Sequence, residues 1–194
     1  MSHTHYVTDA LVLGGTPVGE ANRYLSLLTR EFGLVAALAR GVRFERSKLR
    51  FALADGRACT LTLLRGREVW RITGAMPAAW APALSRKEAA LRARLFALLR
   101  RLLPGEERND ELFAIIEDAL SFLAREHPQG ASLAALEELS VLRALGALGY
   151  RSRAPALAPL LGAEPVGSVT LARAAALHRP LVSEINSLLS ASHL

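Results

Sequence analysis

The stretch that decides the fold covers residues 9–75 and reads DALVLGGTPVGEANRYLSLLTREFGLVAALARGVRFERSKLRFALADGRACTLTLLRGREVWRITGA. Short runs of apolar and polar residues alternate between glycine-rich turns, which is typical of β-strands rather than helices. The alternation is clearest where Cys59, Leu61 and Leu63 share one face and Thr60 and Thr62 share the other. This pattern predicts a strand with one face buried in a core.

Five strand-like runs fit this part of the chain, near residues 6–13, 24–29, 34–40, 59–64 and 69–73. The longer insertion between the third and fourth runs has room for a basic loop or a short helix. Five short strands with such an insertion are the layout of an OB-fold barrel. An SH3-like barrel would have much the same layout, and the strand pattern alone does not separate the two.

The second half of the chain has a helical pattern. Residues 76–84 contain two prolines and are interpreted as a connector, after which Ser85 and Glu88 form a capping-box pattern. Leucines then recur at helical spacing through three segments before two shorter helical stretches. We therefore predict an α+β protein: a five-stranded OB-fold barrel for nucleic-acid binding over residues 1–76, a linker over 77–84 and an α-helical domain over 85–194.

The positive charge is concentrated in the first half. The formal net charge is +6, of which residues 1–80 carry +5 and residues 81–194 carry +1. Arginine forms paired hydrogen bonds to phosphate. However, a GC-rich genome would also favour arginine over lysine, so the clustering matters more than the residue type. A basic barrel surface is typical of a nucleic-acid partner.

The predicted DNA contacts are cations of this half, densest between residues 40 and 50. Phe44 and Phe51 flank that dense segment, and we interpret them as core side chains rather than as platforms on which bases stack. A second cationic group, on the helix that follows Ser85, ranks below the first because its members spread around the helix. The candidate DNA-binding residues are Arg23, Arg40, Arg43, Arg46, Lys48, Arg50, Arg65, Arg67 and Arg71.

The sequence shows none of the common catalytic patterns. There is no phosphate-binding loop ending in Lys-Ser/Thr, no GxSxG elbow, no HExxH and no CxxC. Cys59, the single cysteine, lies on the apolar face of a strand and is interpreted as a small core residue. We expect no catalytic residue, no cofactor and no metal site.

Several short motifs resemble the N-terminal domain of the RecO family of DNA repair and recombination mediator proteins. They occur in order over about residues 8–75, as Gly19-Glu20, Leu27–Glu31 (LLTRE), Ala39-Arg40-Gly41, Ser47–Arg50 (SKLR) and Arg65–Glu68 (RGRE). The helical half is more weakly similar, through ELSVLRALGALGY at residues 138–150 and HRPLVSEI at residues 178–185.

The resemblance implies an accessory protein that is not an enzyme. It would bind single-stranded and double-stranded DNA, anneal complementary strands, and act with RecR and in some cases RecF to load RecA onto DNA coated by single-strand-binding protein. A hydrophobic groove in the helical half would accept the C-terminal tail of that protein. The expected location is the cytoplasm, at the nucleoid, with no membrane partner.

The chain also departs from the family pattern. Many members carry a four-cysteine zinc element after the GY position, whereas this shorter chain has RSRAPALAPLLGAEPVG there. A single cysteine and scattered histidines therefore predict no bound zinc. Two alternatives from other classes stay open: an OB-fold adaptor that docks a protein, and an RNA-binding protein without annealing activity.

Overall fold

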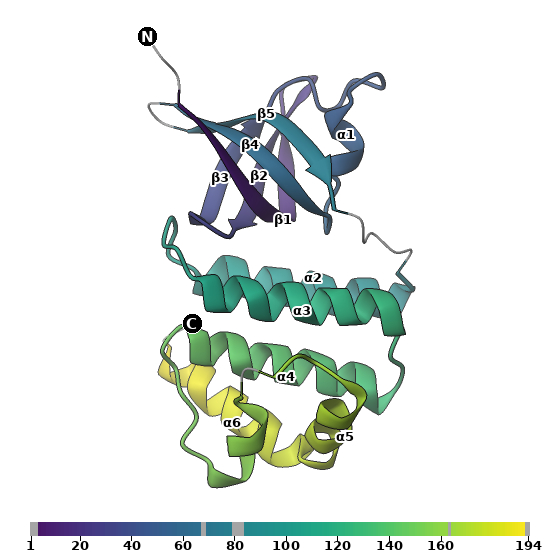
Figure 1. The fold of residues 1–194 in the computed structure, drawn as a ribbon, viewed down its shortest axis with the longest axis vertical. Helices are drawn as coiled ribbons and strands as arrows, with labels where there is room; N and C mark the ends of the chain where they lie inside the picture. The colour runs from purple at the N-terminus through teal and green to yellow at the C-terminus, as the bar shows by residue number, and fades with distance from the viewer. Residues whose placement is uncertain (1–3, 67–68, 79–83, 163, 193–194) are drawn as a thin grey trace. The chain divides into compact units, whose positions relative to one another are not determined.

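The computed structural model describes residues 4–66, 69–78, 84–162 and 164–192 (Figure 1). It divides into two compact units, each described by itself. One comprises Met1–Ala81 and Phe96–Asp110, and the other comprises Pro82–Leu95 and Glu111–Leu194. Residues 79–83 of the predicted linker lie outside the described residues, and the predicted domain boundaries stay a prediction.

The first unit is built on a five-stranded barrel. Its strands are β1 (His5–Val18), β2 (Asn22–Thr29), β3 (Gly33–Ala39), β4 (Ala58–Arg65) and β5 (Trp70–Pro77). The strands close in the order β1-β2-β3-β5-β4, and β3 and β5 pair in parallel at Ala37↔Trp70 and Leu38↔Arg71. This crossed order confirms the predicted OB-fold barrel.

One long strand, β1, closes the barrel by pairing with two neighbours. Its first half pairs with β4 and its second half with β2, and the register shifts between Val12 and Gly14. Gly14 has a φ of +139°, and a Cβ on Gly15 would lie 2.4 Å from the carbonyl oxygen of Tyr24. Glycines are therefore required where β1 bends.

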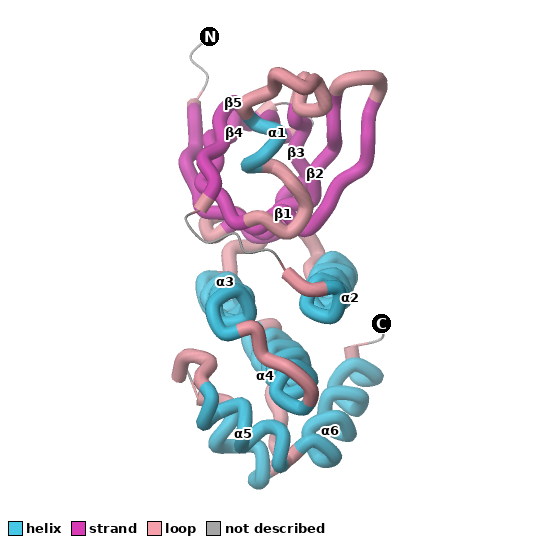
Figure 2. Tube along the Cα trace, turned by 90° about the vertical axis from the view of Figure 1, so that its right-hand side faces the viewer, coloured by secondary structure: helices cyan, strands magenta, loops and turns pink. Residues whose placement is uncertain are grey.

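A short helix, α1 (Leu49–Ala52), lies across one open end of the barrel (Figure 2). It occupies the insertion between the third and fourth strands, where the sequence predicted a basic loop or a short helix. Ala52 and Leu53 are buried there, and Leu53 belongs to the barrel core. The alternating residues Cys59, Leu61 and Leu63 belong to the same core, as predicted.

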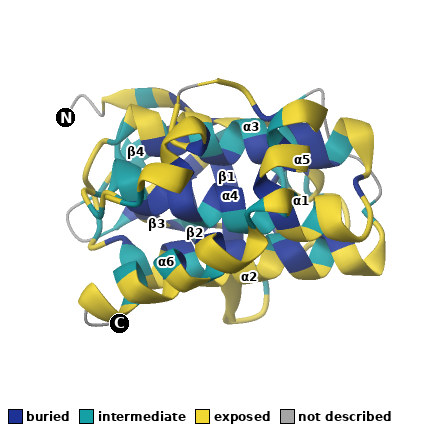
Figure 3. Cartoon of the chain, turned by 90° about the horizontal axis from the view of Figure 1, so that it is seen from below, coloured by how far each residue is buried: buried dark blue, intermediate teal, exposed yellow. Residues whose placement is uncertain are grey.

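The helices of the second half follow the predicted apolar stripes. They are α2 (Arg86–Leu102), α3 (Asp110–Glu126), α4 (Ala131–Ala147), the 3-10 helix η1 (Pro155–Leu160), α5 (Ser168–Ala176) and α6 (His178–Ala191). Buried residues extend along α4, whereas α5 and α6 expose much of their surface (Figure 3). Helix α4 contacts both α5 and α6, and forms the centre of the helical unit.

The capping box at the start of α2 is present as predicted. The Ser85 amide donates to the Glu88 carboxylate at 2.6 Å, and the Glu88 amide donates to the Ser85 hydroxyl at 3.4 Å. Burial raises the pKa of Glu88, but hydrogen bonds from Ser85 and His127 outweigh it and hold the pKa below its ordinary value. Glu88 is therefore a buried, ionised residue that fixes the start of the helix.

Candidate nucleic-acid interface

The dense cationic segment of residues 40–50 is an ordered loop that leads into α1. Gly41 has a φ of +63°, and its amide donates to Asn22 Oδ1 at 2.9 Å. Within the loop, the Phe44 amide donates to the Gly41 carbonyl, and the Ser47 amide to the Phe44 carbonyl. These successive turns satisfy the backbone locally and leave the side chains to project outward.

Four cations of this segment have no ion-pair partner among the described residues. Arg40, Arg46, Lys48 and Arg50 are exposed. Within the part of the chain that the structure describes, no carboxylate lies within 4 Å of any of them. Unpaired and exposed charge of one sign attracts a polyanion from a distance. The loop therefore has the electrostatics of a phosphate-binding surface.

Arg43 and Arg23 are held more firmly than the other cations. Arg43 Nη1 donates to the Gly19 carbonyl at 3.1 Å. Arg23 Nη2 lies 2.7 Å from Asp55 Oδ1, and the Arg23 guanidinium also donates to the carbonyls of Gly15 and Leu53. Arg23, Arg43 and Arg50 line one small cavity together with Val42. The structure thus brings three of the nine predicted residues together around a single space.

The remaining candidates lie on or between β4 and β5. Arg65 forms an ion pair with Glu106 at 3.3 Å, and its guanidinium lies 5.1 Å from the centre of the Trp70 ring. Arg71 is exposed on β5, and Arg67 lies outside the described residues. Because Arg65 already has a carboxylate partner, it offers less free charge to a phosphate than the loop does.

The prediction that Phe44 and Phe51 are core side chains is wrong. Phe44 is 58% exposed and Phe51 is 60% exposed. The barrel end is filled by Ala52 and Leu53, so these rings are left outside the core. The Arg57 guanidinium lies 3.8 Å from the centre of the Phe51 ring. Exposed rings beside unpaired cations form the combination that stacks bases while the cations follow the backbone of a single strand.

No catalytic or metal-binding group stands out within the described residues. Burial, and secondarily the charge of Asp9, raise the pKa of the Cys59 thiol to about 12, so the thiol stays protonated at neutral pH. Over the same residues, no three His, Cys, Asp or Glu side chains gather closely enough to hold a metal ion. A search of their helices for one long and apolar enough to cross a membrane found none.

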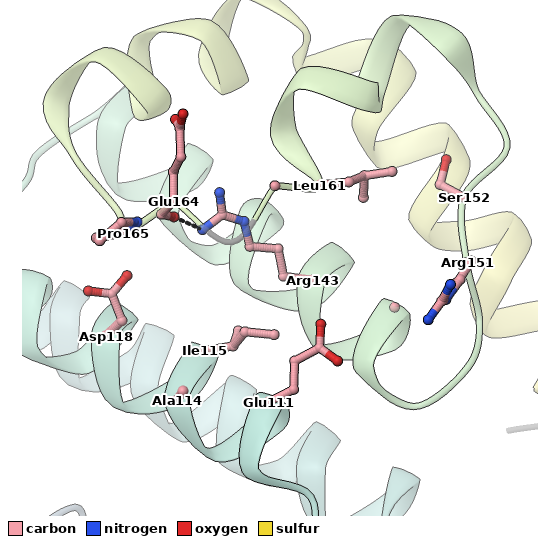
Figure 4. A pocket seen from close by; sticks show the side chains of 12 residues that line it. Glu111, Ala114, Ile115, Asp118, Arg143, Arg151, Ser152, Leu161, Glu164 and Pro165 are labelled. Carbon is pink, nitrogen blue, oxygen red and sulfur yellow. Dashed lines mark hydrogen bonds between the residues drawn. The ribbon is translucent and has the colours of Figure 1, made fainter.

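The helical unit contains a cavity of about 650 Å³ (Figure 4). Its walls come from α3, α4 and residues 151–165, and its lining is mainly apolar. At one side lies Arg143, which is 8% exposed and donates to the carbonyls of Leu160 and Glu164 at 2.9 and 2.8 Å. Burial lowers the pKa of this guanidinium. Its charge is therefore poorly solvated.

Sequence reasoning expected a hydrophobic groove in the helical half, but it assigned no residues to that groove and missed Arg143. The signal was a single cation within the otherwise apolar run SVLRALGALGY of residues 140–150. A charge in such a run indicates that the buried face of the helix has a polar partner. Asp55, the partner of Arg23, was also missed. Its neighbours in sequence are those of an ordinary turn, and nothing in them indicates an ion pair with Arg23.

Comparison with known proteins identifies the family. Residues 1–79 match the family model described as Recombination protein O N terminal. The chain belongs to the RecO family. The motifs of residues 19–68 and the barrel fall within the matched residues, and the predicted resemblance is thereby confirmed.

Several relatives carry the name DNA repair protein RecO, and three of them show the extent of the similarity. The protein of Myxococcus xanthus is 39% identical over 148 residues, which cover 73% of this chain and 59% of the relative. The protein of Synechococcus sp. (strain JA-2-3B'a(2-13)) is 33% identical over 146 residues, covering 69% and 50%. The protein of Pelotomaculum thermopropionicum is 32% identical over 143 residues, covering 73% and 55%. The chain spans about half the length of these curated RecO relatives.

Proposed function

We propose that this chain is a non-enzymatic DNA-binding protein of recombinational repair, which binds single-stranded and double-stranded DNA and anneals complementary strands. The observation that carries the proposal is the exposed loop of residues 40–50, with its four unpaired cations and the exposed ring of Phe44. It stands on an OB-fold barrel, an architecture that binds oligonucleotides. Membership of the RecO family supports the same role.

Annealing follows from the same surface. Two strands repel each other through their phosphates, and a dense cationic surface reduces that repulsion by replacing condensed counterions. Exposed Phe44 and Phe51 would hold bases by stacking, without reading their sequence. The protein would therefore bring two strands together with no bond made or broken. It would act in the cytoplasm, at the nucleoid.

Salt dependence tests this proposal. If about four phosphates are neutralised, the logarithm of the single-stranded DNA affinity should fall with the logarithm of salt concentration with a slope near −3, at roughly −0.7 per contact. Fluorescence anisotropy with a labelled oligonucleotide at several salt concentrations measures the slope. A slope near zero would favour the adaptor. Tighter binding to RNA of the same sequence, without DNA annealing, would favour the RNA-binding alternative.

Loading of a recombinase requires protein partners as well. We propose RecR, RecF and RecA as partners from the family role, and the C-terminal tail of single-strand-binding protein as the occupant of the helical cavity. The apolar lining suits apolar side chains of the tail. Its acidic groups would meet Arg143 and Arg151, and would avoid the Glu111 carboxylate, which also lines the cavity. In Figure 4 the Glu164 carboxylate points away from the cavity, and Asp118 accepts the Val166 amide at 2.6 Å.

Reversing one exposed arginine tests the tail site. Arg151→Glu should weaken binding of a labelled tail peptide about tenfold, because an attraction becomes a repulsion at the cavity wall. Arg173→Glu is the matched control, since Arg173 is exposed on α5 and does not line the cavity. Fluorescence polarisation measures both. Equal losses in the two variants would remove the cavity as the tail site.

A further inference from the structure

The three arginines that meet at the barrel end surround a cavity of about 280 Å³. Its lining consists of Arg23, Arg43, Arg50 and Val42, so three of the four lining side chains are cationic. Guanidinium groups suit tetrahedral oxyanions, because each can donate two parallel hydrogen bonds to one phosphate. The composition of this cavity therefore selects an anion over an apolar ligand.

Two of the three guanidinium groups are held in position by neutral acceptors. Arg43 Nη1 donates to the Gly19 carbonyl in the turn between β1 and β2, and the Arg43 amide donates to the Ala21 carbonyl at 3.0 Å. Arg23 donates to the carbonyls of Gly15 and Leu53 at 3.3 and 3.4 Å. A backbone carbonyl orients a guanidinium without neutralising it. The cavity is thus organised for an anion while most of its positive charge stays available.

One carboxylate offsets that charge. Asp55 Oδ1 lies 2.7 Å from Arg23 Nη2, and the two side chains are 59% and 20% exposed, respectively. No other carboxylate lies within 4 Å of the three arginines, over the residues that the structure describes. Arg23 is confined at the cavity, whereas Asp55 is free to turn into solvent. An incoming anion would therefore compete with Asp55 for the same guanidinium.

We propose that this cavity binds a phosphate group of DNA, and that Asp55 limits the affinity by occupying Arg23 in the unbound protein. The inference rests on the proposed function, because DNA is the source of the phosphate. The phosphate belongs either to the backbone or to a strand end, and both present the same oxyanion. When the phosphate binds, it takes the place of the Asp55 carboxylate on Arg23.

The test removes the Asp55 charge and keeps its shape. Asp55→Asn should tighten binding of single-stranded DNA about two- to fivefold, the range expected when an exposed ion pair no longer competes. Asparagine before Gly56 preserves the turn, because an Asn-Gly pair favours it. Glu45→Gln is the matched control, since it removes one negative charge from the basic loop away from Arg23. A gain with Asp55→Asn no larger than with Glu45→Gln would overturn the inference.

Two further arms identify the source of the phosphate and separate the inference from the proposed function. Oligonucleotides with and without a 5′-phosphate are compared: an equal gain indicates a backbone phosphate, and a gain confined to the phosphorylated strand indicates a strand end. Inorganic pyrophosphate is then titrated in a thermal-shift assay without DNA. A larger shift for Asp55→Asn than for Glu45→Gln supports the cavity even if the wild-type protein binds no DNA. Equal shifts would refute the cavity even if DNA binds.

Discussion

Reversing the charge of Arg43, Arg46, Lys48 and Arg50 to glutamate should reduce affinity for single-stranded DNA by about a hundredfold, if each lost contact is worth roughly 0.7 kcal/mol. Strand annealing should be lost with it. The fold should persist, because all four side chains are exposed. Over the residues that the structure describes, the tertiary side-chain hydrogen bond lost is that from Arg43 to the Gly19 carbonyl, which is worth about 1 kcal/mol.

A matched quadruple variant separates a local effect from a change in net charge. The control reverses four exposed cations of α2 and α3, with the same total change in charge: Arg86, Lys87, Arg101 and Arg125. The control should stay within about threefold of the wild-type affinity, because none of its four cations belongs to the loop and exposed charges are screened by salt. Circular dichroism confirms folding of both variants. Wild-type annealing by the loop variant, or equal loss in the control, would move the DNA site away from the loop.

The sequence predicted those features of the fold that depend on neighbouring residues. Alternation at Cys59, Leu61 and Leu63 shows which face is buried, and Ser85 with Glu88 marks where α2 begins. Barrel closure was less accessible, since it depends on the parallel pairing of Ala37 with Trp70, which lie far apart in the chain. Two barrel types share the same strand pattern, so that pattern alone could not separate the OB-fold from the SH3-like barrel.

In the candidate site, too, local features could be predicted from the sequence and contacts between distant residues could not. The dense basic loop was visible because its charges are neighbours in sequence. The ion pairs of Arg23 with Asp55 and of Arg65 with Glu106 could not be predicted, because their residues lie 32 and 41 positions apart in the chain, respectively. These contacts distinguish cations already engaged from cations that are free, which a count of charges cannot do.

The wrong prediction that Phe44 and Phe51 are buried has a physical reason. An aromatic residue is usually expected to be buried, yet a good part of any protein surface is apolar. Local turns set the direction of these side chains, and the adjoining Ala52 and Leu53 fill the barrel end. The hydrophobicity of the two residues therefore predicted burial, whereas the geometry of the turns places their side chains on the surface. The exposed rings are consistent with a surface that stacks bases.

Replacing Trp70 with alanine should destabilise the barrel by about 3–5 kcal/mol, the range for deleting a buried large aromatic ring. Trp70 is 3% exposed, and its ring centre lies 5.5 Å from that of Tyr6 and 5.1 Å from that of Phe32. Its indole N–H donates to Glu106 Oε1 at 2.8 Å. The substitution removes a large part of the 5–15 kcal/mol or so that stabilises an ordinary domain.

Trp70→Phe is the matched control, because it keeps an aromatic ring in the core and removes the N–H donor. It should cost only about 1–2 kcal/mol, since Glu106 is partly exposed and can be solvated by water. Hydrogen exchange of the strand amides measures barrel stability separately from the helices, which tryptophan fluorescence cannot do once the tryptophan is replaced. If Trp70→Ala destabilised the strands no more than Trp70→Phe, the bond to Glu106 would matter more than the packing of the ring. Because the ring is buried, Trp70→Phe should leave DNA affinity unchanged, and the buried core would then be separable from the DNA-binding loop.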